Sequence, residues 1–154
     1  MTSNLLASLG IYGASFAIAF IAGLFPIASI ELFLVGLSAL RHPSIGELVV
    51  CCVLGALGHQ VAKTITYFAG EGALENKKLK PRVDAIRHRI ERWDRYPHAI
   101  LFLSATVGLP PIYLIGFIAH PLMEIRFLPF TLITFIGRMG RYLVLAVIPL
   151  ALRM

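Results

Sequence analysis

The chain has 154 residues, of which 58% are hydrophobic and 14% are charged, and its mean hydropathy is +0.81. This composition excludes an ordinary soluble globular domain of this size and predicts an integral membrane protein whose single domain spans residues 1–154. The net charge of +6 is concentrated between Lys77 and Arg95, so it indicates orientation in the membrane and does not indicate nucleic-acid binding.

The first half predicts two apolar helices with a short broken segment between them. Residues 5–24 are long enough for one transmembrane helix and residues 45–70 for another. Residues 25–40 are too few for a full crossing, and Pro26 interrupts their apolar run while Glu31 lies near its centre. A short, broken, apolar segment with a central carboxylate predicts a re-entrant segment that lines a cavity.

One face of the helix predicted over 45–70 is small and polar. That face consists of Gly55, His59, Ala62, Lys63, Thr66 and Gly70. Lys63 is therefore expected to point inward and to help bind a substrate, and His59 and Gln60 are candidates for lining a cavity. For His59 the alternative is a hydrogen-bonded structural histidine, and for Lys63 it is a side chain that snorkels to the membrane surface.

A charged linker, residues 71–97, separates the two sets of apolar segments. Within it an apolar stripe recurs at spacings of three and four, formed by Leu79, Val83, Ile86, Ile90 and Trp93. Because the remaining surface is rich in lysine and arginine, the linker is predicted to be an amphipathic helix on the membrane surface. The positive-inside rule places this basic linker in the cytoplasm.

Residues 98–121 and 127–152 repeat the order of a broken segment followed by a crossing helix. Pro110 and Pro111 remove two amide donors from 98–121, which predicts a second re-entrant segment, and 127–152 is long enough to cross the bilayer. With the linker cytoplasmic, the two broken segments enter from opposite sides. The prediction is an all-α membrane protein: an inverted repeat of a re-entrant helical hairpin plus transmembrane helix, preceded by the N-terminal transmembrane helix 5–24.

Two arginines, Arg138 and Arg141, lie in the middle of the last apolar run. From Phe127 to Arg138 the helix would rise roughly 16 Å, about half of a ~30 Å hydrocarbon core. A charge at this depth costs on the order of 3 kcal/mol or more unless it faces protein or water. Their i,i+3 spacing puts both on one face with Thr131 and Thr134, so we expect an internal cationic site there.

Two interpretations of this cationic site are open. In the first, Arg138 and Arg141 bind an anionic group, most simply a phosphate, with help from Lys63. In the second, the buried charges form an ion pair with Glu31 that only fixes the packing. Glu31 could also exchange a proton that drives transport, since a nearby cation controls the protonation of a carboxylate at this depth.

Three functions follow from these interpretations. The first is a transporter or scramblase-like protein for an anionic substrate, the second a non-transporting membrane assembly factor, and the third a proton-coupled efflux protein for small molecules. The sequence has no paired histidines at metal spacing, no nucleophile elbow and no phosphate-binding glycine loop, so we expect no enzyme, no cofactor and no metal. The expected partners are membrane lipids and an anionic lipid or small anion, and the small residues permit a homodimer without specifying one.

Four stretches distributed between residues 25 and 142 form one pattern. They are 25–31 with Gly36, 55–63 with 67–70, 108–111 with Gly116, and 137–142. In this order, and with an amphipathic linker between them, they resemble the DedA/VTT (SNARE-associated) superfamily of small membrane proteins, particularly its short bacterial members. Unlike typical members, the chain carries no charge in residues 105–113, around the prolines of the second hairpin.

The resemblance implies two opposed re-entrant hairpins that meet at mid-membrane. It also implies movement or scrambling of phospholipids or polyprenyl phosphate across the bacterial cytoplasmic (inner) membrane, in some members coupled to the proton gradient. The acidic site of the first hairpin corresponds to Glu31, and the basic helix positions correspond to Lys63, Arg138 and Arg141.

Overall fold

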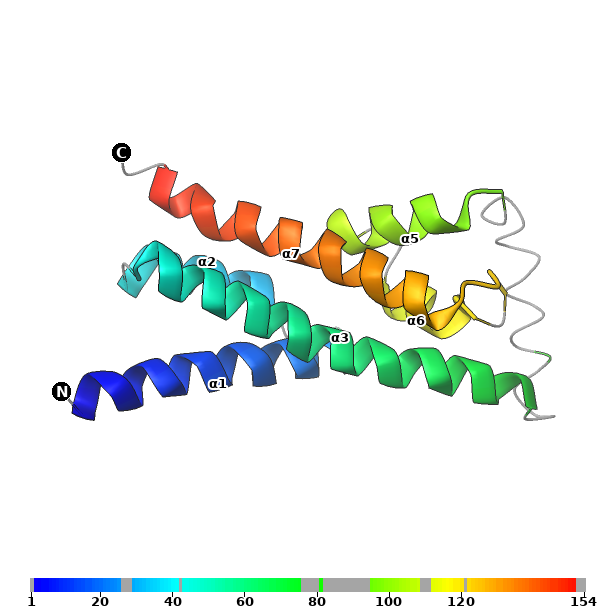
Figure 1. Cartoon of the computed structure of the whole chain (residues 1–154), viewed down its shortest axis with the longest axis horizontal. Coiled ribbons are helices and arrows are strands. Elements are labelled where there is room, and N and C mark those ends of the chain that lie inside the picture. Colours follow the sequence, from blue (N-terminus) through cyan, green and yellow to red (C-terminus); the bar gives the residue numbers. More distant parts are fainter. Residues whose placement is uncertain are drawn as a thin grey trace. The chain divides into compact units, whose positions relative to one another are not determined.

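A computed structural model describes residues 2–25, 29–41, 43–75, 81, 95–108, 112–120 and 122–151. Within these ranges there are six helices and no strand (Figure 1). The helices are α1 (Thr2–Leu24), α2 (Ile30–Arg41), α3 (Ile45–Glu75), α5 (Pro97–Thr106), α6 (Ile112–Ile118) and α7 (Phe127–Ala151). The prediction of an all-helical chain is confirmed for the described part.

The chain divides into two compact units, and each is described separately. The first unit comprises Met1–Ala62 and Arg138–Met154, and the second comprises Lys63–Gly137. Helices α3 and α7 each contribute one part to each unit, because the divisions fall within them.

Two serines bind backbone amides at the starts of helices. The amide of Leu32 donates to Ser29 Oγ at 3.3 Å before α2, which satisfies one of the N–H groups that the first turn leaves without a partner. At the start of α3, Ser44 and Glu47 form a capping box: the Glu47 amide donates to Ser44 Oγ at 3.3 Å, and the Ser44 amide donates to Glu47 Oε2 at 2.9 Å. These local contacts explain why α2 and α3 begin where they do.

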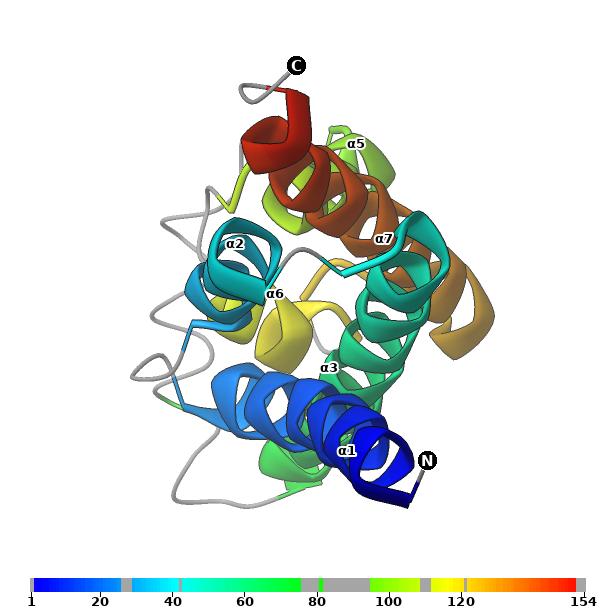
Figure 2. The same cartoon turned by 90° about the vertical axis from the view of Figure 1, so that its left-hand side faces the viewer.

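Small residues bring the helices of the first unit close together. A Cβ added at Gly58 of α3 would overlap the backbone carbonyl oxygen of Phe16, so α1 and α3 approach each other at backbone distance. Helix α2 packs against α1, and the Ser38 hydroxyl of α2 donates to the carbonyl oxygen of Ala146 in α7 at 2.8 Å. Figure 2 shows these helical segments end-on.

The second unit has an apolar core. Its buried members are Tyr67, Leu101, Ile115, Ile118, Ala119, Leu122, Met123, Ile125 and Phe130, contributed by all four helices of the unit and the turn before α7. The Tyr67 hydroxyl donates to the carbonyl oxygen of Ile125 at 2.8 Å, which satisfies the polar end of a ring that packs among apolar side chains. Helix α5 packs against α6, and Gly70 lets α3 approach the backbone of Phe117 in α6.

Within the described residues, two helices are long and apolar enough to cross a membrane: Ile45–Gly72 in α3 and Phe127–Pro149 in α7. Both expose apolar stripes at helical spacing, formed by Leu57, Val61, Ile65 and Phe68 on α3 and by Leu128, Leu132 and Ile136 on α7. Charged and polar side chains on the same helices are buried, which reverses the arrangement usual in water-soluble proteins. Helix length and this reversed arrangement together support a membrane location.

The observed helices extend or divide the predicted segments. The predicted helix 45–70 continues to Glu75 in α3, and the predicted helix 5–24 begins at Thr2 in α1. The predicted re-entrant segment 98–121 contains two short helices, α5 and α6. Helix α5 ends at Thr106, the Gly108 amide still donates to the carbonyl oxygen of Ser104 at 3.1 Å, and the φ of 91° at Gly108 then turns the chain out of the helix.

Several predicted features lie outside the described residues. Pro26 and Pro110, at the breaks of the two predicted re-entrant segments, are among them. Most of the linker 71–97 is also outside, apart from residues 71–75, 81 and 95–97. The amphipathic linker helix and the two breaks therefore stay predictions.

Candidate functional site

Arg138 of α7 and His59 of α3 meet inside the first unit. Arg138 Nη1 lies 3.3 Å from His59 Nδ1 and donates a hydrogen bond to the Tyr142 hydroxyl oxygen at 3.2 Å. That hydroxyl oxygen is itself 3.5 Å from His59 Nδ1. Tyr142 follows Arg138 by one helical turn, so both side chains face α3 from the same side of α7. The three polar groups therefore form a closed triangle.

The guanidinium group in this triangle is buried, and its hydrogen-bond partners among the described residues are uncharged. Arg138 is 6% exposed, His59 4% and Tyr142 0%. Across the part of the chain that the structure describes, Arg138 forms no ion pair, and its Nε atom is buried without a hydrogen-bond partner. A buried cation without a counter-ion is costly, by several kcal/mol in typical proteins. This arrangement is the one a bound anion would complete.

The hydrogen bonds define which nitrogen of His59 carries the proton. A guanidinium group only donates hydrogen bonds, so Nδ1 must accept from Arg138. We therefore assign neutral His59 the tautomer with its proton on Nε2. The Tyr142 hydroxyl can then donate to the same Nδ1 while it accepts from Arg138.

Glu31 of α2 forms an ion pair with Arg141, and not with Arg138. Glu31 Oε1 is 3.2 Å from Arg141 Nε, and the two side chains are 25% and 27% exposed. The Ser29 hydroxyl donates to the other carboxylate oxygen, Oε2, at 3.1 Å. Arg141 directly precedes Tyr142 in α7, and Glu31 belongs to the same unit as the Arg138 triangle. The two arginines thus have different environments, although their spacing predicted one shared site.

The other predicted site residues lie in both units. Gln60 is 8% exposed and follows His59 in the first unit. Lys63 is 1% exposed and belongs to the second unit, where its side chain passes close to Gly116 of α6. Thr134 is fully buried in the second unit, and its hydroxyl donates to the carbonyl oxygen of Phe130 at 2.7 Å, which is a local helix contact.

No family model, curated protein or solved structure matches the chain.

The sequence interpretation did not include Tyr142 among the site residues. Its position one turn after Arg138 is a usable signal, but tyrosines are common in apolar helices, and only the contact with His59 distinguishes this one. Among the described residues there is no group of three or more histidine, cysteine or acidic side chains that could hold a metal ion.

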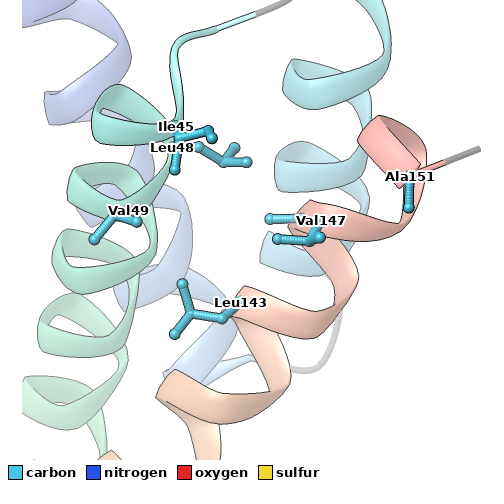
Figure 3. A pocket seen from close by; sticks show the side chains of 7 residues that line it. Ile45, Leu48, Val49, Leu143, Val147 and Ala151 are labelled. Carbon is cyan, nitrogen blue, oxygen red and sulfur yellow. The ribbon is translucent and has the colours of Figure 1, made fainter. Parts of the chain in front are cut away.

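A second feature of the first unit is an apolar pocket between the first turns of α3 and the last turns of α7 (Figure 3). Its volume is about 210 Å³, and its lining is formed by Ile45, Leu48, Val49, Leu143, Ala146, Val147 and Ala151. No polar atom lines the pocket, so it suits a hydrocarbon group and not a charged one. Leu143, at one end of the lining, directly follows Tyr142 in α7.

Proposed function

We propose that this chain is a membrane transporter or scramblase-like protein that moves an anionic substrate, most simply a lipid phosphate, across the bilayer. The observation that carries the proposal is Arg138, a cation that is 6% exposed and has only uncharged partners among the described residues. A charge placed in an apolar helix is costly, and such residues usually face a partner or a pathway for a charged substrate. A phosphate or similar anion supplies the missing negative charge.

The free donors of Arg138 suit an anion with several oxygens. Nη1 donates to Tyr142 and His59, whereas Nε has no hydrogen-bond partner among the described residues. Guanidinium groups bind carboxylates and phosphates through two parallel N–H donors, and such charge-assisted pairs are about twice as strong as neutral hydrogen bonds. In this proposal the anion binds on the Nε side of Arg138, and Tyr142 and His59 hold the guanidinium plane.

The apolar pocket supports a lipid over a small inorganic anion. Along α7, the helix rises roughly 7 Å from Arg138 to Leu143 and roughly 20 Å to Ala151, which is on the scale of an extended acyl chain. A lipid with its phosphate at Arg138 can therefore place hydrocarbon along the pocket lining. In this proposal the pocket selects lipids and the arginine selects a negative headgroup.

The membrane arrangement is part of the same proposal. Helices α2 and α5 have 12 and 10 residues, and at 1.5 Å per residue both are too short for a ~30 Å hydrocarbon core. Helix α2 precedes the long apolar helix α3, and α5 together with the short helix α6 precedes the long apolar helix α7, which favours two re-entrant segments in an inverted repeat. We further propose similarity to the DedA/VTT superfamily, a multi-pass position in the bacterial inner membrane and a cytoplasmic linker. The homodimer stays a prediction.

The second candidate function is a non-transporting assembly factor. The observation that favours it is the ion pair between Glu31 and Arg141, because paired charges can stabilise packing without binding a substrate. The third function, proton-coupled efflux of small molecules, needs Glu31 as the substrate ligand. Both carboxylate oxygens of Glu31 already have partners, in Arg141 and Ser29, which disfavours efflux.

The proposal is tested with the purified full chain in liposomes. Three probes are followed: a headgroup-labelled phospholipid, polyprenyl phosphate and radiolabelled sulfate. We expect the lipid probes to cross with the native chain and to stop crossing with Arg138→Gln, because glutamine keeps hydrogen bonding but removes the charge. Arg126→Gln is the matched control, since Arg126 is an exposed arginine just before α7.

The outcomes separate lipid transport, small-anion transport and the non-transporting assembly factor. Lipid movement lost in Arg138→Gln and retained in Arg126→Gln supports the lipid-phosphate pathway. Movement of sulfate alone supports a transporter of small anions. No movement of any probe by a chain that elutes as a single folded species overturns transport and favours the assembly factor.

A further inference from the structure

The hydrogen bond between Arg138 and His59 does more than hold the guanidinium group. It uses Nδ1, which is the only atom of the neutral imidazole tautomer in this site that can take up a proton. As long as Arg138 donates to Nδ1, that atom cannot carry a proton, because an N–H on His59 would face an N–H on Arg138. Binding at Arg138 and protonation of His59 are therefore physically connected.

Among the described residues, the charged groups near His59 oppose its protonation before an anion binds, with one exception. Arg138 is in contact with His59, Arg141 lies one residue before Tyr142, and Lys63 follows His59 by one turn of α3. Glu31 is the exception, but its charge is paired with Arg141. Helix α1 approaches His59 through Gly23, which has no side chain. These cations, together with the hydrogen bond that Nδ1 accepts from Arg138, favour neutral His59 before an anion binds.

A bound anion reverses this preference. When the anion accepts hydrogen bonds from Arg138, Nη1 can leave Nδ1, and the negative charge favours an imidazolium beside it. A proton from solvent then binds Nδ1. The Tyr142 hydroxyl, 3.5 Å from Nδ1, can change from donating to neutral His59 to accepting from the imidazolium. No other group in the triangle needs to move a proton.

We propose that His59 is a proton-binding site linked to the anion site, so that each anion bound at Arg138 brings one proton onto His59 Nδ1. This inference rests on the proposed function and assigns the linked proton to His59 instead of Glu31. The linkage is reciprocal. Protonation of His59 raises the affinity for the anion by the same factor by which the bound anion raises the affinity of His59 for the proton, so lower pH strengthens anion binding. One linked proton changes a binding constant by up to about tenfold per pH unit.

The test uses probes whose own charge is constant near neutral pH. Radiolabelled sulfate represents a free anion, and a headgroup-labelled phospholipid with a phosphodiester represents a lipid. Transport by the full chain in liposomes is measured from about pH 5.5 to about pH 8, the interval in which an ordinary histidine titrates. We expect the KM of the transported probe to fall at least about fivefold from the highest pH to the lowest.

The decisive variant is His59→Asn. The asparagine Oδ1 can replace Nδ1 as the acceptor for Arg138 but cannot be protonated, so the dependence on pH is lost and the KM of the variant changes by less than about twofold over the same interval. His98→Asn is the matched control, because His98 is an exposed histidine in α5, and it keeps the native pH dependence. Thermal unfolding of each variant confirms that the protein is folded.

A proton count provides a second readout if His59→Asn does not fold. A pH-sensitive dye enclosed in the liposomes reports acidification of the interior as the native chain transports sulfate, or as it moves the labelled lipid inward. Transport that requires Arg138 but is independent of pH and moves no protons overturns the inference alone. No transport of either probe overturns the proposed function and this inference with it.

Discussion

Replacing Glu31 by glutamine is the sharpest test of how the buried charges are paired. The substitution removes the negative charge 3.2 Å from Arg141 Nε and leaves that guanidinium group 27% exposed without its counter-ion. The ion pair is partly buried, between the exposure of a surface pair and that of a core pair. Its loss therefore lowers the free energy of unfolding by about 1–2 kcal/mol. Glu31 also lies in the first turn of α2, where the interaction of its negative charge with the helix dipole stabilises the protein by about 0.3–1 kcal/mol.

These two contributions give a destabilisation of about 1–3 kcal/mol for Glu31→Gln, which corresponds to a fall in Tm of roughly 2–10 °C for a chain of this length. Thermal unfolding of the detergent-purified protein measures it. Arg138→Gln is the contrast. Arg138 has no counter-ion in the part of the chain that the structure describes, so the removal of its charge offsets its two lost hydrogen bonds, and Tm changes by less than about 3 °C.

Charge reversal provides the control. Glu31→Arg with Arg141→Glu restores an ion pair, although the new arginine is unfavourable at the start of α2, so we expect partial recovery of the Tm lost in each single variant. An unchanged Tm in Glu31→Gln would refute this pairing. It would also be refuted if Glu31→Arg with Arg138→Glu recovered Tm while Glu31→Arg with Arg141→Glu did not.

Two further predictions concern the close helix contact and the apolar pocket. Gly58→Ala pushes a methyl group into the carbonyl oxygen of Phe16, so we expect the free energy of unfolding, measured by thermal unfolding, to fall by about 1–3 kcal/mol. Gly13 has open space around it, so Gly13→Ala should raise the free energy of unfolding by up to about 1 kcal/mol. Equal effects of the two substitutions would contradict the close approach of α1 and α3. Val147→Phe fills part of the apolar pocket, so transport of the labelled phospholipid falls at least about tenfold while sulfate transport is unchanged. A parallel loss of both probes would show that the pocket does not select lipids.

Much of the local structure could be predicted from the sequence, because helix periodicity, capping residues and apolar length act over one or two turns. The burial of Lys63 and Arg138 was predicted from their positions in long apolar runs, and both are less than 7% exposed. The helix 45–70 was predicted from its length, but its continuation to Glu75 was not, because charged residues beyond 70 indicated a linker.

The partner of each buried charge could not be predicted in this way. The spacing of Arg138 and Arg141 places them on one face, and that spacing alone suits either one shared anion site or an ion pair of either arginine with Glu31. Which arginine meets the carboxylate depends on the rotation and depth at which α2 packs against α7. The structure pairs Glu31 with Arg141 and leaves Arg138 with uncharged groups.

The sequence by itself thus determined that the chain is helical and apolar, and that it buries cations within its long helices. The tertiary structure decided that His59 and Arg138, 79 residues apart, share a hydrogen bond, and that Tyr142 completes their triangle. The physical reason is range: a helix and its buried face are encoded by residues within a turn of one another, whereas a contact between two helices depends on the packing of every side chain between them.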